Sequence, residues 1–113
     1  MVSVVFTGEF QDWFSTLSQQ QEESVVRVVD LLEVRGLALG HPYPSAIKGS
    51  TIALRELRAQ SGGHPLRVFY AFDPQRQAVL LIGGDKTGDG RFYEQMVPRA
   101  ETIWAQYLAE TKR

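Results

Sequence analysis

The fold of this chain is constrained most by the stretch from Ile52 to Lys86, which reads IALRELRAQSGGHPLRVFYAFDPQRQAVLLIGGDK. Short apolar segments alternate there with turn residues, and these segments are rich in β-branched and aromatic side chains. Such runs predict strands rather than helices. We therefore expect a three-stranded antiparallel meander with strands at about 52–59, 66–72 and 78–82.

The residues between these segments predict how the strands are joined. Ser61–Pro65, which reads SGGHP, predicts a turn longer than the tightest hairpin connections. Asp73–Arg76 predicts a turn with proline at its second position, where a fixed φ is favoured. Residues 78–82 are apolar throughout and are expected to be buried on both faces. The glycine-rich segment 83–90, GGDKTGDG, is expected to be a loop that leaves the sheet.

Two helices are expected before the meander. Residues 2–7 predict a first strand, and apolar residues at the spacing i, i+3, i+4 and i+7 then predict a short helix. These apolar residues are Phe10, Trp13, Phe14 and Leu17. Ser18 and Gln21 form a capping-box pattern that predicts the start of a second helix, and Gly36 predicts its end.

A connector and a last helix complete the expected architecture. Residues 37–49 contain two prolines and two glycines, which predict an irregular loop. Apolar residues recur at helical spacing behind Pro98, and proline is favoured in the first turn of a helix. The predicted fold class is α+β, and residues 1–113 are expected to form a single domain.

Composition excludes several kinds of chemistry. The chain has no cysteine, so disulfides, thiolate metal sites and a cysteine nucleophile are excluded. The two histidines lack clustered carboxylates, and GGDKTGDG lacks the spacing of a phosphate-binding loop, so we expect no metal and no cofactor. Nowhere do about 18 apolar residues follow one another, so we expect no membrane span, and the cytoplasm is the expected location.

Charge is divided unevenly along a chain whose formal net charge is −1. Residues 1–47 contain two basic and six acidic residues, a net charge of −4. Residues 48–91 contain seven basic and four acidic residues, a net charge of +3. The predicted meander is therefore the basic part of the chain.

Two arginines of the meander are candidates for an anion-binding site. Side chains two residues apart share a face of a strand, so Arg58 shares a face with Glu56. If the register also brings Arg67 beside Arg58, a phosphodiester suits the pair, because the guanidinium fork binds its oxygens bidentately. The alternative is that these arginines form ordinary surface ion pairs with Glu56, Asp73 or helix carboxylates.

The order of elements and several short motifs resemble a known family. The motifs are LRELR at 54–58, RVFY at 67–70, VLLIGG at 79–84, the lysine loop at Lys86 and FY at 92–93. Together they resemble the RelE/ParE superfamily of toxins from bacterial type II toxin–antitoxin modules, and within it the HigB-type branch, which is also found in phage-derived genes. The resemblance covers nearly the whole chain. It implies a small ribonuclease that enters the ribosomal A site and cuts mRNA there without a metal.

The resemblance also implies roles for individual side chains. Arg58 and Arg67 would hold the scissile phosphate, and Lys86 would do similar work from the loop after the last strand. Tyr93 would stack on a base or assist proton transfer. Glu56 would either take the proton of the 2′-hydroxyl group or neutralise the two arginines.

The resemblance also implies further candidate site residues, and the chain differs from RelE in the second strand. His64, in the SGGHP turn, is a candidate proton shuttle because the ordinary pKa of histidine lies near neutrality. The residues expected to contact RNA besides the catalytic ones are Arg55, Arg91 and Phe92. Where RelE has a basic pair in the second strand, this chain has Leu54 and Glu56.

The resemblance implies partners and leaves alternatives open. The implied partners are a cognate antitoxin, often with a helix-turn-helix domain, and the ribosome with its mRNA. The same fold also supports a ParE-like protein that poisons DNA gyrase without nuclease chemistry. A third alternative is a non-toxic, phage-derived binding protein whose arginines only pair with a partner.

Overall fold

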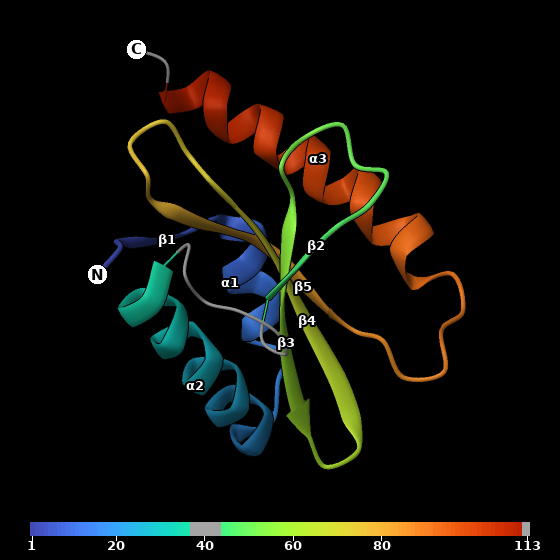
Figure 1. Ribbon diagram of the computed structural model, residues 1–113. Coiled ribbons are helices and arrows are strands. Elements are labelled where there is room, and N and C mark those ends of the chain that lie inside the picture. The colour runs from blue at the N-terminus through green and yellow to red at the C-terminus, as the bar shows by residue number, and fades with distance from the viewer. Residues whose placement is uncertain (37–43, 112–113) are drawn as a thin grey trace.

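A five-stranded sheet lies between two layers of helices in the computed structural model, which describes residues 1–36 and 44–111 (Figure 1). In chain order the elements are β1 (Val4–Phe6), α1 (Gly8–Phe14), α2 (Gln19–Arg35), β2 (Pro44–Ala46), β3 (Arg55–Ser61), β4 (His64–Phe72), β5 (Ala78–Asp85) and α3 (Phe92–Thr111). The strand order is β1–β5–β4–β3–β2. β1 runs parallel to β5, and all other neighbours are antiparallel. The α+β class and the meander, β3–β4–β5, are confirmed.

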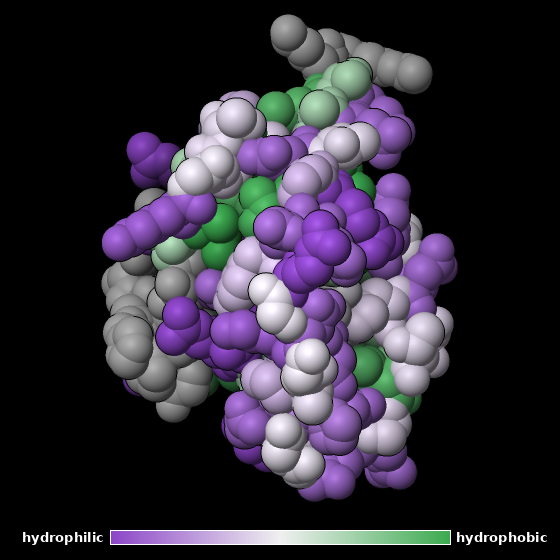
Figure 2. All heavy atoms as spheres, turned by 90° about the vertical axis from the view of Figure 1, so that its right-hand side faces the viewer, coloured by the Kyte–Doolittle hydropathy of each residue, from purple (hydrophilic) through white to green (hydrophobic). Residues whose placement is uncertain are grey.

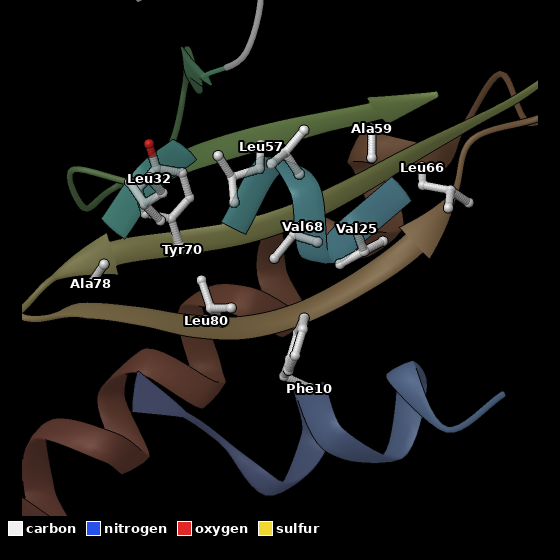
Figure 3. Packing of buried hydrophobic residues seen from close by; sticks show 11 residues of the cluster. Phe10, Val25, Leu32, Leu57, Ala59, Leu66, Val68, Tyr70, Ala78 and Leu80 are labelled. Atoms are coloured by element: carbon white, nitrogen blue, oxygen red, sulfur yellow. The ribbon is translucent and has the colours of Figure 1, made fainter. Parts of the chain in front are cut away.

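Alternation along the strands divides the core between the two faces of the sheet. Under α1 and α2 the buried cluster includes Phe10, Val25, Leu32, Leu57, Val68 and Leu80 (Figure 3). Under α3 the buried cluster includes Leu54, Phe69, Val79, Leu81, Phe92 and Trp104. β5 contributes to both clusters, as its apolar run predicts.

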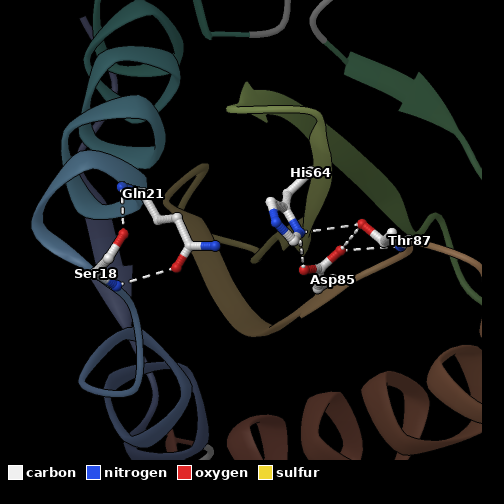
Figure 4. A network of polar contacts seen from close by, with 5 residues as sticks. All are labelled: Ser18, Gln21, His64, Asp85 and Thr87. Carbon is white, nitrogen blue, oxygen red and sulfur yellow. Dashed lines mark hydrogen bonds and ion pairs between the residues drawn. The ribbon is translucent and has the colours of Figure 1, made fainter.

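The predicted ends of α2 are confirmed. The Ser18 backbone N–H donates to Gln21 Oε1 at 3.0 Å, and the Gln21 backbone N–H donates to Ser18 Oγ at 3.2 Å (Figure 4). This reciprocal capping box satisfies N–H groups that have no partner inside the helix. At the other end Gly36 adopts φ +53°, a conformation that glycine takes without steric cost.

The hairpin between β3 and β4 is tighter than the sequence predicts. Ser61 pairs with His64, so Gly62 and Gly63 alone form the loop, with φ angles of +55° and +83°. Two residues with positive φ give a turn whose twist matches that of the flanking strands. The prediction of a longer turn over Ser61–Pro65 is therefore wrong.

Gly83 and Gly84 lie in β5 and not in the predicted loop. A Cβ atom on Gly83 would overlap the ring of Trp13, and one on Gly84 would lie 2.8 Å from the ring of Phe92. The two glycines therefore let α1 and α3 approach the same part of β5 from opposite faces. Residues 86–91 form the connection from β5 to α3.

Other elements also differ from expectation. β3 spans Arg55–Ser61 and not the predicted 52–59. α3 begins at Phe92, so Pro98 lies inside the helix and not in its first turn. β2 falls within the predicted connector 37–49, of which residues 37–43 lie outside the described part of the chain. Among the described helices, none has the length and apolar character needed to cross a membrane.

Asp73 joins the turn between β4 and β5 to the C-terminal half of α3. Its carboxylate accepts hydrogen bonds from the backbone N–H groups of Gln75 and Gln77 at 3.0 and 2.8 Å. The Tyr107 hydroxyl and the Gln77 side-chain amide each donate to it at 2.9 Å. Burial raises the pKa of Asp73, but the hydrogen bonds outweigh burial, so the pKa lies below its ordinary value.

Asp73→Asn is expected to lower the free energy of unfolding at neutral pH by about 1–3 kcal/mol, because buried donors lose their acceptor. It should also flatten the acid sensitivity of the protein. A carboxyl with a lowered folded-state pKa adds stability above its unfolded pKa of about 3.9, and this stability is lost as pH falls through the folded value. Urea denaturation from neutral pH to about pH 2.5 tests this, with the exposed Asp12→Asn as control. Equal acid profiles for wild type and Asp73→Asn would contradict it.

Candidate active site

The register of β3 and β4 brings two arginines together on the face covered by α3. Arg58 and Arg67 are direct cross-strand partners. Two residues further along the same strands, Glu56 pairs with Phe69, so both pairs share one face of the sheet. Because Phe69 packs in the cluster under α3, Glu56, Arg58 and Arg67 all project toward that layer. The sequence alone does not fix how Glu56, Arg58 and Arg67 lie relative to one another. In the structure they lie together beside the start of α3.

Glu56 is the centre of this group. The residue is only 3% exposed, and its Oε1 atom accepts a hydrogen bond from the Tyr93 hydroxyl at 2.7 Å. The Nε atom of Arg67 lies 3.1 Å from the same Oε1 atom as an ion pair, although its N–H is not aligned as a hydrogen bond. Arg58 Nη2 lies 4.0 Å from Oε2. The carboxylate therefore meets two guanidinium groups and one hydroxyl group. The two short contacts are both to Oε1, so Oε2 is the oxygen with fewer close partners.

Tyr93, in the first turn of α3, is held by aromatic and cationic neighbours. Its ring meets Phe69 and Phe92 edge-on, with centroid distances of 6.2 and 5.3 Å. Lys86 Nζ lies 4.9 Å from the centroid of the Tyr93 ring, a cation–π distance. Burial, followed by the hydrogen bond to Glu56, raises the pKa of Tyr93, so its hydroxyl keeps its proton at neutral pH and acts as a donor.

A groove of about 630 Å³ opens above these side chains, and we call it the β3–α3 groove. Its lining includes Glu56, Arg58, Lys86, Tyr93, Glu94 and Glu101, together with residues 46–49. Figure 2 views the molecule from the side that carries the 86–91 connection and the start of α3, where hydrophilic residues predominate. The groove is open to solvent, and its charged side chains are interspersed with apolar ones such as Ile47, Val97 and Pro98. Such a surface suits an extended ligand.

The acidic side chains of the groove are engaged within the protein. Glu94 Oε2 accepts from Arg91 Nε at 2.9 Å. Glu101 accepts from the Ser50 hydroxyl at 2.7 Å and fastens the loop after β2 to α3. By contrast, neither Lys48 nor Lys86 has an ion-pair partner among the described residues. The charges left to meet a ligand are therefore cationic.

His64 lies on the other face of the sheet. It shares its face of β4 with Leu66 and Val68, which pack under α1 and α2. Its Nδ1 atom lies 2.8 Å from Asp85 Oδ2 and 3.3 Å from Thr87 Oγ1 (Figure 4). Partial burial raises the pKa of Asp85, but hydrogen bonds from Thr87 and His64 outweigh it and leave the pKa below its ordinary value. The structure therefore does not bring His64 to the β3–α3 groove.

The three residues expected to add RNA contacts are not brought into the groove. Arg55 pairs with Tyr70 in the sheet and shares its face, under α2. Phe92 is 3% exposed and stacks on Phe69, so its ring serves the core and is closed to a nucleotide base. Arg91 is exposed beside the groove and is held by Glu94. The structure therefore places neither Arg55 nor Phe92 in the lining of the β3–α3 groove.

Lys48 was missed by sequence reasoning. It reaches the groove because β2 pairs with β3 and because Glu101 holds the following loop against α3. No local motif marks this position, since a lysine before a glycine is ordinary loop composition. Within residues 1–36 and 44–111, no group of three or more histidine, cysteine or acidic side chains is arranged to hold a metal ion.

Comparison with protein-family models decides the family. The model described as "Phage derived protein Gp49-like (DUF891)" matches residues 12–105. The chain belongs to this family.

Curated relatives of this Gp49-like chain come from Mycobacterium tuberculosis (strain ATCC 25618 / H37Rv). It is 37% identical over 110 residues to "Putative toxin HigB3", covering 96% of this chain and 95% of that protein. It is 35% identical over 101 residues to "Putative toxin HigB2", covering 87% of this chain and 50% of that protein. The HigB-type resemblance inferred from the motifs is thus confirmed.

The Gp49-like chain also has the fold of a solved toxin. A mutant of E. coli toxin RelE in the free state superimposes with a TM-score of 0.58, covering 84% of this chain and 94% of that one. The two sequences are 11% identical, so this likeness shows the fold alone. The RelE-like fold expected from the order of elements is confirmed.

Proposed function

We propose that this Gp49-like protein is the toxin of a type II toxin–antitoxin module and that it cleaves mRNA on the ribosome without a metal. The observation that carries the proposal is the convergence of Arg58 and Arg67 on the buried carboxylate of Glu56, with Lys86 at the rim. The relationship to "Putative toxin HigB3" along nearly its whole length supports the toxin role. Such a protein acts in the cytoplasm, and its partners are the ribosome, mRNA and a cognate antitoxin.

The side chains of the β3–α3 groove, together with the neighbouring Arg67, which does not line it, can be assigned to the steps of RNA cleavage. Oε2 of Glu56 takes the proton of the 2′-hydroxyl group, whose oxygen then attacks the adjacent phosphorus. Arg58 and Arg67 stabilise the negative charge that builds up on the non-bridging oxygens. The ammonium of Lys86 gives a proton to the departing 5′-oxygen. The products are a 2′,3′-cyclic phosphate and a 5′-hydroxyl end, so bonds and protons balance.

Tyr93 has a supporting part in this assignment. Its hydroxyl donates to Oε1 and so leaves Oε2 to face the substrate. One side of its ring is already covered by Lys86, so a stacked nucleotide base would have to share the ring with that ammonium group. Tyr93 therefore orients the carboxylate and the lysine.

Induced production of the protein in growing bacteria, followed by primer extension on abundant mRNAs, tests the proposal. Growth arrest with new 5′ ends inside translated frames is expected. In a reporter with an early stop codon, cuts should occur before the stop codon and vanish after it, because cleavage needs a translating ribosome. Growth arrest with intact mRNA and accumulated gyrase–DNA cleavage complexes would reject the ribonuclease assignment. Unaffected growth would reject the toxin assignment itself.

A further inference from the structure

Glu101 on α3 is engaged by the loop after β2 through only one of its two carboxylate oxygens. Its Oε2 atom accepts hydrogen bonds from the Ser50 hydroxyl at 2.7 Å, the Thr51 backbone N–H at 2.8 Å and the Thr51 hydroxyl at 3.1 Å. Within residues 1–36 and 44–111, Oε1 has no hydrogen-bond donor and Glu101 has no ion-pair partner. Because Glu101 lines the β3–α3 groove, Oε1 is the atom that it offers to a ligand there.

The loop fixes both the protonation state and the direction of this carboxylate. The hydrogen bond from Ser50, followed by that from the Thr51 backbone, lowers the pKa of Glu101, so the group is ionised at neutral pH and acts only as an acceptor. Rotation of the carboxylate would break every hydrogen bond to Oε2 at once, and each unmade hydrogen bond is costly. Oε1 is therefore a positioned acceptor.

The position of Glu101 on α3 relates it to the proposed reaction centre. Tyr93, Val97 and Glu101 lie at intervals of four residues, so they share one stripe of the helix. At 1.5 Å per residue, Glu101 lies about 12 Å from Tyr93 along the helix axis, a separation on the scale of one nucleotide. Ile47, Val97 and Pro98 line the same groove, and their apolar side chains suit the flat face of a base better than a phosphate.

An acceptor oxygen in a groove that binds RNA selects the group that faces it. Phosphate oxygens are also acceptors, so they cannot form a hydrogen bond with Oε1, whereas the amino group of a base can donate one. Adenine and cytosine carry such amino groups at N6 and N4. At the corresponding places guanine and uracil carry the carbonyl oxygens O6 and O4, which are acceptors. Oε1 therefore favours adenine or cytosine.

We propose that Glu101 is a specificity-determining residue that selects adenine or cytosine at a nucleotide next to the scissile phosphate, through a hydrogen bond from the amino group of the base to Oε1. The inference rests on the proposed function, because it takes RNA as the ligand of the β3–α3 groove. The apolar side chains of Ile47, Val97 and Pro98 cover the plane of the base. Arg58 holds the adjoining phosphate at the other end of the nucleotide.

Glu101→Gln tests the inference because it should invert the base preference and not merely abolish it. The donors of Ser50 and Thr51 need an acceptor, so the amide oxygen turns toward them and the amide NH2 group turns toward the groove. A donor in that place favours guanine O6 or uracil O4. At one of the two positions that flank the cut, wild type is expected to favour adenine or cytosine by about tenfold or more, and Glu101→Gln should favour guanine or uracil.

Cleavage rates come from primer extension in a translation extract, on reporter mRNAs that carry each base in turn on either side of one cut. All proteins are compared on the same reporters, so effects of codon decoding cancel. Ser50→Ala removes one hydrogen bond to the loop and should keep the wild-type preference, as should Glu110→Gln, an exposed residue of α3 outside the groove. A Glu101→Gln that is folded by urea denaturation and keeps the wild-type preference would overturn the inference, as would a wild type without any preference.

Binding of RNA that cannot be cut separates this inference from the proposed function. The probe is a short, fluorescently labelled RNA with a 2′-deoxy nucleotide at the cut and each base in turn beside it, and fluorescence anisotropy reports its binding. If wild type cuts no mRNA but binds adenine or cytosine probes more tightly, and Glu101→Gln inverts this order, the ribonuclease assignment fails and the base-selecting site stands. If wild type cuts mRNA and Glu101→Gln inverts neither cutting nor binding, the base-selecting site fails and the ribonuclease assignment stands.

Discussion

Arg67→Ala is expected to reduce mRNA cleavage on the ribosome by about 10²–10³-fold, the cost typical of removing one group that stabilises a transition state. Arg67 is the better buried of the two arginines, with a side chain 13% exposed, against 36% for Arg58. Its guanidinium group is held by the ion pair from Nε to Glu56 and by a hydrogen bond from Nη1 to the Leu66 carbonyl at 3.1 Å. A guanidinium held this firmly needs little reorganisation as charge develops on the phosphate.

Two controls distinguish lost chemistry from lost folding. Arg67→Lys keeps the charge and removes the planar fork, so it should fold like wild type and still cut mRNA at least about tenfold more slowly. Arg27→Ala removes an exposed arginine of α2 and should leave cleavage unchanged. Rates come from primer extension in a translation extract with purified ribosomes, and urea denaturation reports folding. A folded Arg67→Ala that cuts mRNA at the wild-type rate would show that Arg67 does not contact the scissile phosphate.

Glu56 should show two separable effects. Glu56→Ala is expected to lower the free energy of unfolding by about 3–5 kcal/mol, because it leaves the buried part of Arg67 without its counter-charge and the Tyr93 hydroxyl without its acceptor. Glu56→Gln keeps the size of the side chain and an acceptor for Tyr93, so it should cost less stability. Both should lose cleavage by about 10²–10⁴-fold, since neither can take the 2′-hydroxyl proton.

The exposed Glu94→Gln provides the matched control for Glu56→Gln. Glu94 lines the same groove, but its partner is Arg91 at the protein surface. Its change should leave both stability and cleavage close to wild type, as is usual for an exposed ion pair. If Glu56→Gln is stable and cuts mRNA as fast as wild type, Glu56 is a counter-charge to the arginines and the base must be sought elsewhere.

Local patterns predicted the elements of this fold well, because their causes are local. The capping box at Ser18 and Gln21 depends on atoms three residues apart, and the alternation in the meander depends on immediate neighbours. The end of β5 was missed because its causes are distant in sequence. Gly83 resembles a loop residue until Trp13, which packs against it, is in place. The glycine pair at 62–63 was read as part of a long turn because sequence does not show which residues pair across it.

The candidate site was predictable in its residue types and not in its arrangement. The motifs indicate Arg58, Arg67, Lys86 and Tyr93, but only the pairing register of β3 and β4 brings the two arginines beside Glu56. A register shifted by one residue would have put one arginine on the opposite face. Closeness in sequence does not place two residues in the same site. His64 is only three residues from Arg67, yet it lies on the opposite face of the sheet.

The paired glycines of β5 make the sheet thin at one point. Trp13 on one side and Phe92 on the other rest directly on the backbone there, just before the loop that carries Lys86. Elsewhere a layer of side chains separates α1 from α3, but here only a strand backbone does. The two helical layers of the protein therefore come closest next to the loop that carries Lys86, the proposed proton donor.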